Sequence, residues 1–414
     1  MKKNIYLLIL MSFLCFGKAE SQWVTFTMPI GTDLFDCSFP SVNTGYVCGY
    51  GNGFFKTTNS GLSWINLSFP GTAQNLNAVH FINNETGFLC STNDTMYRTT
   101  NGGMNWVNNV FIGYPVSRVQ FTNELTGFAS GLNKFSKTTN GGLNWITTNT
   151  PSYGGMYFLN TSTGWILNYI GSGSSEILKT TNSGINWTSQ FTTTNFFILY
   201  DINFTDANSG WAVGNRFCIY KTTDGGQNWN LQNSVVNAGG LYSVYFVNSS
   251  TGWAVGDYYP TVGANSFYTT NGGTNWIGSN FPTGGRMFRV MFNNSTTGWI
   301  SSQYGKVFKT TNNGGLTTVK ETGSNLPGKF NLEQNYPNPF NSMTNVKFQI
   351  ENEGLVVLKL FDIRGLEIET IVKESLHPGT YEIKFDAKDL PSGVYFYKFT
   401  AGNYSQTRKM ILVK

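Results

Sequence analysis

Four charged residues fall at one position of a pattern that the chain repeats seven times. The pattern is a short strand that ends in an aromatic residue, a turn, and then Gly followed by a second aromatic residue. The first residue of that strand varies between repeats as follows: Asp36, Ala78, Arg118, Gly155, Asp201, Ser243 and Arg289. Two guanidinium groups and two carboxylates on one rim could bind a polar ligand, or they could pair with one another as ordinary surface ions.

A second repeated motif indicates which elements position those side chains. Its first copy runs from Lys56 through two threonines to Trp64, and the tryptophans of the six clearest copies are 42, 39, 42, 42 and 47 residues apart. Threonine pairs favour a strand, and Asn before Ser-Gly or Gly-Gly favours a tight turn, because Gly accepts a positive φ. We predict a β-hairpin in each copy, with these structural markers: Asn59 and Trp64, Asn101 and Trp106, Asn140 and Trp145, Asn182 and Trp187, Asp224 and Trp229, Asn271 and Trp276.

The two patterns interleave, so that each repeat of about 42 residues holds four short strands. Four strands per repeat and seven repeats predict an all-β, seven-bladed β-propeller over residues 20–320. The segment Trp23–Thr27 resembles a Trp strand without a hairpin before it, while the seventh hairpin has Val319 where Trp is expected. We therefore expect the N-terminal strand to complete the last blade and remove its exposed edge.

The candidate ligand site follows from this architecture. Propeller ligands bind over the central channel, on the face made by the loops that enter the innermost strands. If the strand that ends in Phe is innermost, its first residue marks the channel rim. The candidate ligand-binding residues are therefore Arg118, Arg289, Asp36 and Asp201 on the rim, and Arg286, Tyr258 and Tyr259 on the loops of the same face.

An enzyme would need a catalytic pair that the sequence does not indicate. Glycosidases use two carboxylates held about 5 to 9.5 Å apart. Asp36 and Asp201 belong to blades one and five, and we expect a wide ring to keep them too far apart. A serine nucleophile needs a histidine partner, and His80, the one histidine of the propeller, lies inside a strand pattern. We predict no catalytic residues.

Composition excludes several other classes. Between residues 23 and 319, twelve Lys and Arg stand against ten Asp and Glu, which excludes the clustered positive charge of a nucleic-acid site. The sequence has no Cys-x-x-Cys motif and no His/Cys cluster, so we expect no metal site and no cofactor. The four cysteines of the mature chain are small buried hydrophobes or include one disulfide: Cys37, Cys48, Cys90 and Cys218.

The two ends of the chain carry export signals. Residues 1–19 have two lysines, a 12-residue apolar run and a Gly-Lys-Ala site, as in a secretory signal peptide; Cys15 leaves a lipoprotein alternative open. We expect no transmembrane segment in the mature chain, because no apolar run is long enough. After a linker at residues 321–330, alternating strands over residues 331–414 predict a small sandwich like those of immunoglobulin or fibronectin-III domains.

Three family resemblances accompany these patterns. The hairpin motif resembles the Asp-box (neuraminidase-type) repeat, with Asn in place of Asp in every copy but one. The same boxes, with Gly-Trp-Ala-Val-Gly at residues 210–214 and 252–256, make the propeller similar to the photosystem II stability/assembly factor family. The C-terminal blocks at residues 332–341, 361–365, 391–397 and 409–412 resemble the type A sorting domain of the type IX secretion system.

Together these features predict an exported, non-catalytic binding or scaffolding propeller that recognises a protein or a glycan at its channel face. The sorting-domain resemblance implies that the type IX secretion machinery is a partner of residues 331–414, and that the protein is secreted or displayed on the outer cell surface. The alternative is a carbohydrate-active hydrolase, sialidase-like or glucanase-like, on the same propeller.

Overall fold

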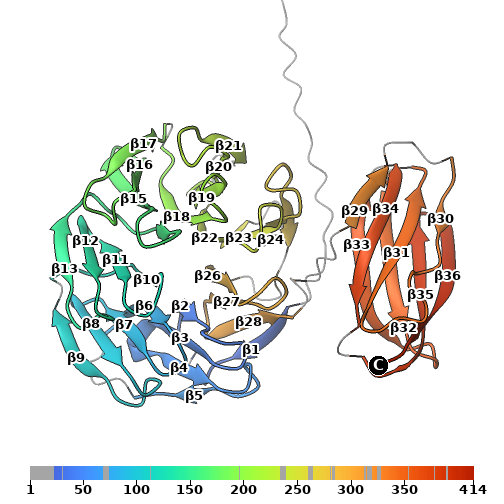
Figure 1. Ribbon diagram of the computed structural model, residues 1–414, viewed down its shortest axis with the longest axis horizontal. Coiled ribbons are helices and arrows are strands. Elements are labelled where there is room, and N and C mark those ends of the chain that lie inside the picture. Colours follow the sequence, from blue (N-terminus) through green and yellow to red (C-terminus); the bar gives the residue numbers. More distant parts are fainter. Residues whose placement is uncertain are drawn as a thin grey trace, which may run out of the picture.

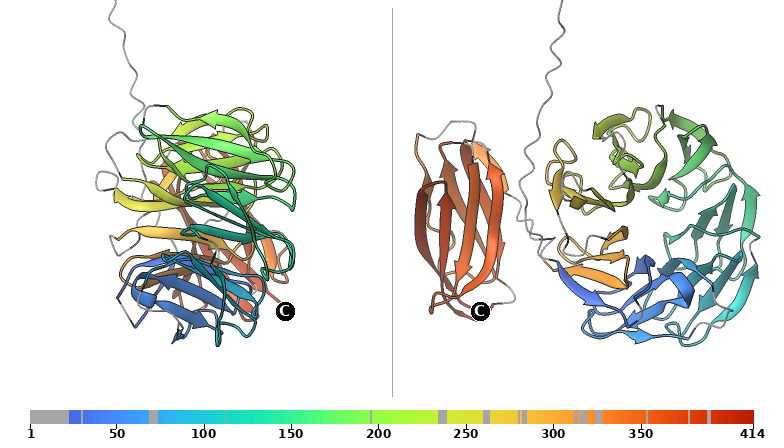
Figure 2. Two further views of the ribbon diagram at one scale, coloured as in Figure 1. Left: turned by 90° about the vertical axis from the view of Figure 1, so that its left-hand side faces the viewer. Right: turned by 180° about the vertical axis from the view of Figure 1, so that it is seen from behind.

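The computed structural model describes residues 23–414, apart from residues 30, 69–73, 112, 195, 234–238, 260–263, 280, 282–284, 312–313, 315–318, 324–327, 353, 377 and 388–389. The predicted signal peptide at residues 1–19 lies outside the described residues. Seven four-stranded antiparallel sheets stand in a ring, which confirms the predicted propeller (Figures 1 and 2). A search of the described residues finds no helix that is both long and apolar enough to cross a membrane.

Each blade runs from the channel outward through consecutive strands. Blade 1 contains β2 (Leu34–Ser38), β3 (Gly45–Gly49), β4 (Phe54–Thr57) and β5 (Ile65–Asn66), with a short 3₁₀ turn, η1 (Tyr50–Asn52). Blade 2 contains β6 (Leu76–Phe81), β7 (Gly87–Ser91), β8 (Thr95–Thr99) and β9 (Val107–Phe111). Blade 3 contains β10 (Arg118–Phe121), β11 (Gly127–Gly131), β12 (Lys134–Thr138) and β13 (Ile146–Asn149). Blade 4 contains β14 (Met156–Phe158), β15 (Gly164–Gly171), β16 (Ser174–Thr180) and β17 (Thr188–Thr192).

The last three blades follow the same order. Blade 5 contains β18 (Leu199–Phe204), β19 (Gly210–Gly214), β20 (Ile219–Thr222) and β21 (Asn230–Asn233). Blade 6 contains β22 (Leu241–Phe246), β23 (Gly252–Tyr259), β24 (Ala264–Thr269) and β25 (Ile277–Ser279). Blade 7 contains β26 (Met287–Phe292), β27 (Gly298–Ser302), β28 (Lys306–Thr310) and, as its outer strand, β1 (Val24–Thr27).

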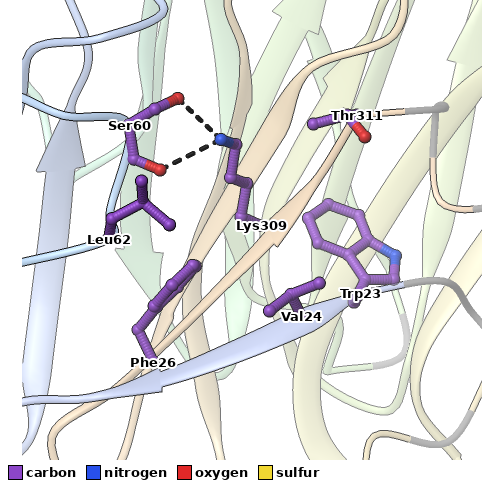
Figure 3. A pocket seen from close by; sticks show the side chains of 7 residues that line it. All are labelled: Trp23, Val24, Phe26, Ser60, Leu62, Lys309 and Thr311. Carbon is purple, nitrogen blue, oxygen red and sulfur yellow. Dashed lines mark hydrogen bonds between the residues drawn. The ribbon is translucent and has the colours of Figure 1, made fainter. Parts of the chain in front are cut away.

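The N-terminal strand closes the ring, as the sequence predicts. β1 pairs antiparallel with β28, and the two strands, drawn in blue and orange, lie side by side (Figure 1). Lys309 donates hydrogen bonds to the backbone and side-chain oxygens of Ser60 in blade 1, at 3.0 and 2.6 Å. A pocket of about 390 Å³ lies at this seam, and Figure 3 shows its lining: Trp23, Val24, Phe26, Ser60, Leu62, Lys309 and Thr311.

The lysine of the Lys-Thr-Thr motif links neighbouring blades elsewhere in the ring. Lys56 donates to the carbonyl oxygen of Gly102 at 2.9 Å, and Lys179 donates to that of Gly225 at 2.8 Å. Each of these carbonyls belongs to the hairpin turn of the next blade. Lys309 therefore bonds blade 7 to blade 1 in the same way that Lys56 and Lys179 bond blades that follow one another in the sequence.

The predicted hairpin turns share one hydrogen-bond scheme. In blade 3, the side-chain oxygen of Asn140 accepts the backbone N–H of Asn144 at 3.0 Å and the hydroxyl of Thr138 at 3.0 Å. The hydroxyl oxygen of Thr138 in turn accepts the backbone N–H of Gly142. The same bonds recur around Asn59, Asn101, Asn182, Asp224 and Asn271.

Aromatic stacking explains why Gly precedes the aromatic residue of each second strand. Phe204 of blade 5 stacks on Trp165 of blade 4, with ring centroids 3.6 Å apart, and meets the edge of Trp229 in its own blade at 5.9 Å. A side chain at Gly210 would collide with the Phe204 ring, because an added Cβ would lie 2.4 Å from it. The repeat of Phe, Gly and aromatic residue therefore encodes the contact between blades.

The four cysteines are buried free thiols, so no disulfide joins Cys37, Cys48, Cys90 or Cys218. They pack as small apolar side chains between blades, which agrees with the prediction of small buried hydrophobes and not with that of one disulfide.

The C-terminal residues form a two-sheet β-sandwich. One sheet has the order β29 (Val319–Gly323), β34 (Gly379–Asp386), β31 (Met343–Ile350) and β30 (Asn331–Leu332). The other has the order β33 (Glu367–Leu376), β32 (Gly354–Phe361), β35 (Gly393–Ala401) and β36 (Tyr404–Leu412). β29 crosses the domain boundary that we placed at residue 320. Because β1 fills the outer position of blade 7, the chain after the seventh hairpin pairs with the sandwich instead.

Candidate functional site

The four rim residues meet in one ion network. The guanidinium of Arg289 lies 3.0 Å from an oxygen of Asp201 and 3.5 Å from an oxygen of Asp36, and Arg118 lies 3.3 Å from the other oxygen of Asp201. The expectation that a wide ring separates Asp36 from Asp201 is therefore wrong. The innermost strands place both side chains in the channel, and one arginine side chain reaches across to contact both.

The two carboxylates also join adjacent blades. Asp36 accepts the backbone N–H of Val79, in blade 2, at 3.0 Å. Asp201 accepts the N–H of Val244 at 3.1 Å and the hydroxyl of Ser243 at 2.9 Å, both in blade 6. Innermost strands have one unpaired edge, so these bonds satisfy N–H groups that no strand covers. The carboxylates therefore have a structural role that their sequence position does not reveal.

Other channel residues also accept backbone N–H groups of the next blade, with different side chains. Ser38 accepts the N–H of Phe81, Gln120 accepts that of Phe158, and Asn203 accepts that of Phe246. At the same position, Nε2 of His80 accepts the N–H of Phe121 at 3.2 Å. A nitrogen that accepts a hydrogen bond is unprotonated, and burial lowers the pKa of His80 to about 4.

Burial and charge act in opposite directions on the two aspartates. Burial raises the pKa of Asp36, although Arg289, Arg118 and two backbone N–H groups oppose that effect. Burial also acts to raise the pKa of Asp201, but there Arg118 and Arg289 outweigh it, and the pKa lies below its ordinary value. Asp201 is the carboxylate that two guanidinium groups contact, which accounts for the difference.

The ion network lines a channel cavity of about 330 Å³. Arg118 and Arg289 are 15% and 25% exposed there. Arg289 is engaged by both aspartates, whereas Nε of Arg118 has no hydrogen-bond partner among the described residues. That Nε is itself buried, so Arg118 is the less completely paired of the two rim arginines.

The candidate residues predicted on the loops lie outside the ion network. Arg286 is half-exposed and pairs with Asp257 at 2.7 Å, and Asp257 also accepts the hydroxyl of Tyr242 at 2.9 Å. Tyr258 follows Asp257 and is exposed. Tyr259 lies in β23, but its side chain is outside the described residues. No contact between these side chains and the ion network is seen in the described part of the chain.

Four aromatic residues at the channel mouth were not predicted. Their rings follow one another across blades 5, 6, 7 and 1, with centroids 5.5, 6.1 and 5.4 Å apart. All four are partly exposed. We call them the aromatic arc: Tyr200, Tyr242, Phe288 and Phe35.

β-bulges place the aromatic arc. The pairing register of each innermost strand shifts at the arc residue, for example between Leu199 and Asp201 in blade 5 and between Met287 and Arg289 in blade 7. A bulge adds an unpaired residue and changes the direction of its side chain. The signal in the sequence was an aromatic residue directly before the rim position in four of the seven blades.

Further aromatic side chains surround the arc. Each innermost strand begins at the same face as the hairpin between the second and third strands, because successive strands are antiparallel. We call this the mouth face. Exposed aromatic residues on its loops and strand ends are Tyr50, Tyr153, Tyr169, Phe196, Tyr258 and Tyr304.

Comparison with family models assigns both parts of the chain. The model described as photosynthesis system II assembly factor YCF48 matches residues 17–162 and 179–316. The model described as secretion system C-terminal sorting domain matches residues 334–414. No curated protein matches the chain.

Solved structures show the same fold at low identity. YCF48 bound to D1 peptide has a TM-score of 0.59 and 18% identity, with 71% of this chain and 99% of that chain covered. YCF48 from Cyanidioschyzon merolae has a TM-score of 0.55 and 18% identity, covering 70% and 98%. The GH74 xyloglucanase from Xanthomonas campestris has a TM-score of 0.55 and 9% identity, covering 79% and 59%. Because the assembly-factor model matches more than half of its residues, this chain belongs to the photosynthesis system II assembly factor YCF48 family, and it carries a secretion-system sorting domain at its C-terminal end.

Proposed function

We propose that this protein is an exported, non-catalytic binding protein that holds an extended segment of a protein ligand at its mouth face. The observation that carries the proposal is the aromatic arc, which is partly exposed and of which three residues directly precede Asp36, Asp201 and Arg289 in the lining of the channel cavity. Partly exposed aromatic residues beside an arginine are the residue types that anchor protein interfaces.

Two observations favour a protein segment over a glycan. The rings of the arc meet at angles of 27, 34 and 89°, so they form an uneven apolar ridge and not a row of parallel faces for sugar rings. A related structure is described as YCF48 bound to D1 peptide, and an extended peptide would suit the length of the arc here. The sorting domain indicates type IX export, so the ligand would be met at the cell surface or outside the cell.

The geometry of the carboxylates argues against hydrolysis. One oxygen of Asp36 accepts the N–H of Cys37 and faces Arg289, while the other accepts the N–H of Val79. Both oxygens of Asp201 are engaged as well, by Arg118, Arg289, Ser243 and Val244. A glycosidase needs one carboxyl group to give a proton to the leaving group and another to face water or the sugar.

A hydrolase nevertheless remains the second candidate, because both carboxylates contact one guanidinium and so lie within reach of a single ligand. The distinguishing experiment uses the purified full-length protein in three assays: selection from a displayed peptide library, a glycan array, and hydrolysis of the glycans that bind. We expect enrichment of peptides and no hydrolysis. Enrichment of glycans alone would contradict the protein ligand, and turnover that Asp201→Asn abolishes in a folded variant would replace the proposal with the hydrolase.

A further inference from the structure

The two outer faces of the C-terminal sandwich differ in chemistry. On the sheet that contains β31 and β34, cross-strand partners on the outer face are polar or charged. They are Asn345 with Lys384, Lys347 with Glu382, and Gln349 with Thr380. Lys347 and Glu382 also form an ion pair at 3.9 Å. Such a face is stable in water without a partner.

The outer face of the other sheet is apolar at one end. Val356, Leu358 and Leu360 of β32 point into the core, so the alternate residues of this strand face outward. There, Phe361 lies opposite Phe396, and Val394 lies opposite Ile411. Lys359 and Lys398 form the next cross-strand pair; Lys359 also pairs with Glu367 at 2.7 Å, so Lys398 is the basic residue at the border of the apolar rows.

The hairpin between β32 and β33 extends this apolar surface. Asp362 accepts the backbone N–H groups of Arg364 at 2.8 Å and Leu366 at 3.0 Å, and it also pairs with the Arg364 guanidinium. The turn is therefore held in one shape by its own side chains. It presents Ile363 and Leu366 with 72% and 56% of their surface exposed.

These residues form one surface that we call the hairpin patch: Phe361, Ile363, Leu366, Phe396 and Lys398. A cavity of about 440 Å³ lies within it, between the turn and strands β35 and β36. An exposed apolar side chain at the tip of a fixed turn adds nothing to the core of its own domain. A cluster of such residues next to a cavity marks an interaction site.

We propose that the hairpin patch is the surface by which a component of the type IX secretion machinery binds this sorting domain. The whole patch lies within residues 334–414, the region that matches the sorting-domain model, so the machinery must contact this domain. Of the two outer sheet faces, the one with the patch has the cluster of apolar residues, whereas Met343 is the single apolar residue on the outward positions of β31 and β34. The partner surface is apolar with an acidic border complementary to Lys398, since Lys359 already pairs with Glu367 at 2.7 Å. The proposal does not depend on what the propeller binds.

The test compares substitutions on the two outer faces of the full-length chain, expressed in a bacterium that has a type IX secretion system. Ile363→Asp and Phe396→Thr alter the patch. The matched control, Met343→Asp, alters an exposed apolar residue on the outer face of the other sheet, where Met343 is 38% exposed. The measurements are the fraction of protein outside the cells and the thermal unfolding of the purified chains.

Loss of an apolar anchor weakens interfaces by about tenfold or more, so we expect at least that fall in the exported fraction for Ile363→Asp, with unfolding unchanged. Met343→Asp should be exported normally. Normal export of both patch variants would overturn the proposal, and so would an equal loss for Met343→Asp. If Ile363→Asp instead abolished self-association and left export intact, the patch would be an interface between copies of the chain, and the proposal would be wrong.

Discussion

The turns of the Asp-box hairpins and the strands that line the channel are both held by side-chain hydrogen bonds, but the two regions differ in how far those side chains are repeated. We call the face that carries the Asp-box turns, opposite the mouth face, the Asp-box end. At the Asp-box end, each turn is held by the same bonds between Asn or Asp, Thr and the backbone. Along the innermost strands, Asp36, His80, Gln120 and Asn203 perform one structural task with four different side chains, because each accepts a backbone N–H of the next blade. Local turn chemistry is repeated in the sequence, whereas the side chains that line the channel vary from blade to blade.

The exposed apolar residues of the two faces also differ in type. On the turns of the Asp-box end they are aliphatic or methionine: Val42, Leu62, Met104, Leu125, Leu143 and Ile185. On the mouth face, six of the eight in the described residues are aromatic, the exceptions being Leu132 and Ile170, and the arc adds four aromatic residues that are partly exposed. Tyrosine and phenylalanine offer large, rigid contact areas, so the mouth face is the one suited to recognition.

The largest expected effect comes from breaking the ion network at the mouth. Arg289→Met would leave Asp36 and part of Asp201 without their shared guanidinium in a buried site. We expect the propeller to lose about 3–5 kcal/mol of unfolding free energy. Urea unfolding followed by tryptophan fluorescence measures this, because all eleven tryptophans lie in the propeller.

Arg118→Met is the matched control. Asp201 keeps Arg289, Ser243 and Val244 in that variant, so we expect a loss of about 1 kcal/mol or less. Equal losses for the two variants would show that the arginines do not differ in structural role. The prediction also means that removing both arginines together would unfold the site, so Arg118 alone is the arginine to use in binding tests.

The next prediction compares how substitutions at the mouth face and at the Asp-box end change the affinity for a peptide. Phe288→Ala removes the ring that links Phe35 to Tyr242 in the arc. We expect the affinity for a peptide selected by the full-length protein to fall about tenfold or more. Fluorescence polarisation with the labelled peptide measures the change.

Leu62→Ala serves as the control at the Asp-box end, where Leu62 is 80% exposed. It should leave the affinity unchanged. An equal loss for Leu62→Ala, or no loss for Phe288→Ala, would place the ligand elsewhere on the propeller.

The sequence predicts one end of the blades better than the other, for physical reasons. Turns and blade number depend on contacts between residues close in the repeat, so the motif around Asn140 specifies its own hydrogen bonds. The closing strand pairs residues far apart, but Trp23 and the missing Trp after the seventh hairpin mark it in the sequence. The contact of Arg289 with Asp36 depends on how far a long side chain reaches across the channel. The arc depends on bulges that shift Tyr200 out of register, and no turn residue marks them.

A smaller effect comes from His80, the channel residue whose imidazole accepts an N–H of the next blade. His80 is neutral in the folded protein with a pKa of about 4, whereas an unfolded histidine has a pKa of about 6.5. Between these values the unfolded chain binds a proton that the folded chain does not. Stability should therefore fall as pH decreases from about 6.5 toward 4. At pH 5, protonation of His80 in the unfolded chain should lower the free energy of unfolding by about 1–2 kcal/mol relative to pH 7. This range allows for contact with solvent, because His80 lines the cavity.

His80→Gln tests that share, because Gln120 already makes the equivalent bond in the next blade at 2.8 Å. The variant should match the original protein at pH 7 and lose less stability at pH 5, measured by urea unfolding at both values. Carboxylates titrate in both proteins, so the difference between them isolates the histidine. Identical pH dependence would rule out the proposed contribution.

The smallest effect should come from one of the repeated turns. Asn140→Ala removes the acceptor for the N–H of Asn144 and the hydroxyl of Thr138, yet the turn is exposed, and water can replace part of what is lost. We expect the unfolding free energy to fall by about 1 kcal/mol in the same fluorescence assay. Asn140→Asp should cost less, because Asp224 holds the equivalent turn of blade 5 with the same bonds. If Asn140→Asp destabilised the propeller as much as Asn140→Ala, the repeated Asn would serve something other than its acceptor oxygen, and the Asp-box end would no longer be the purely structural end of the blades.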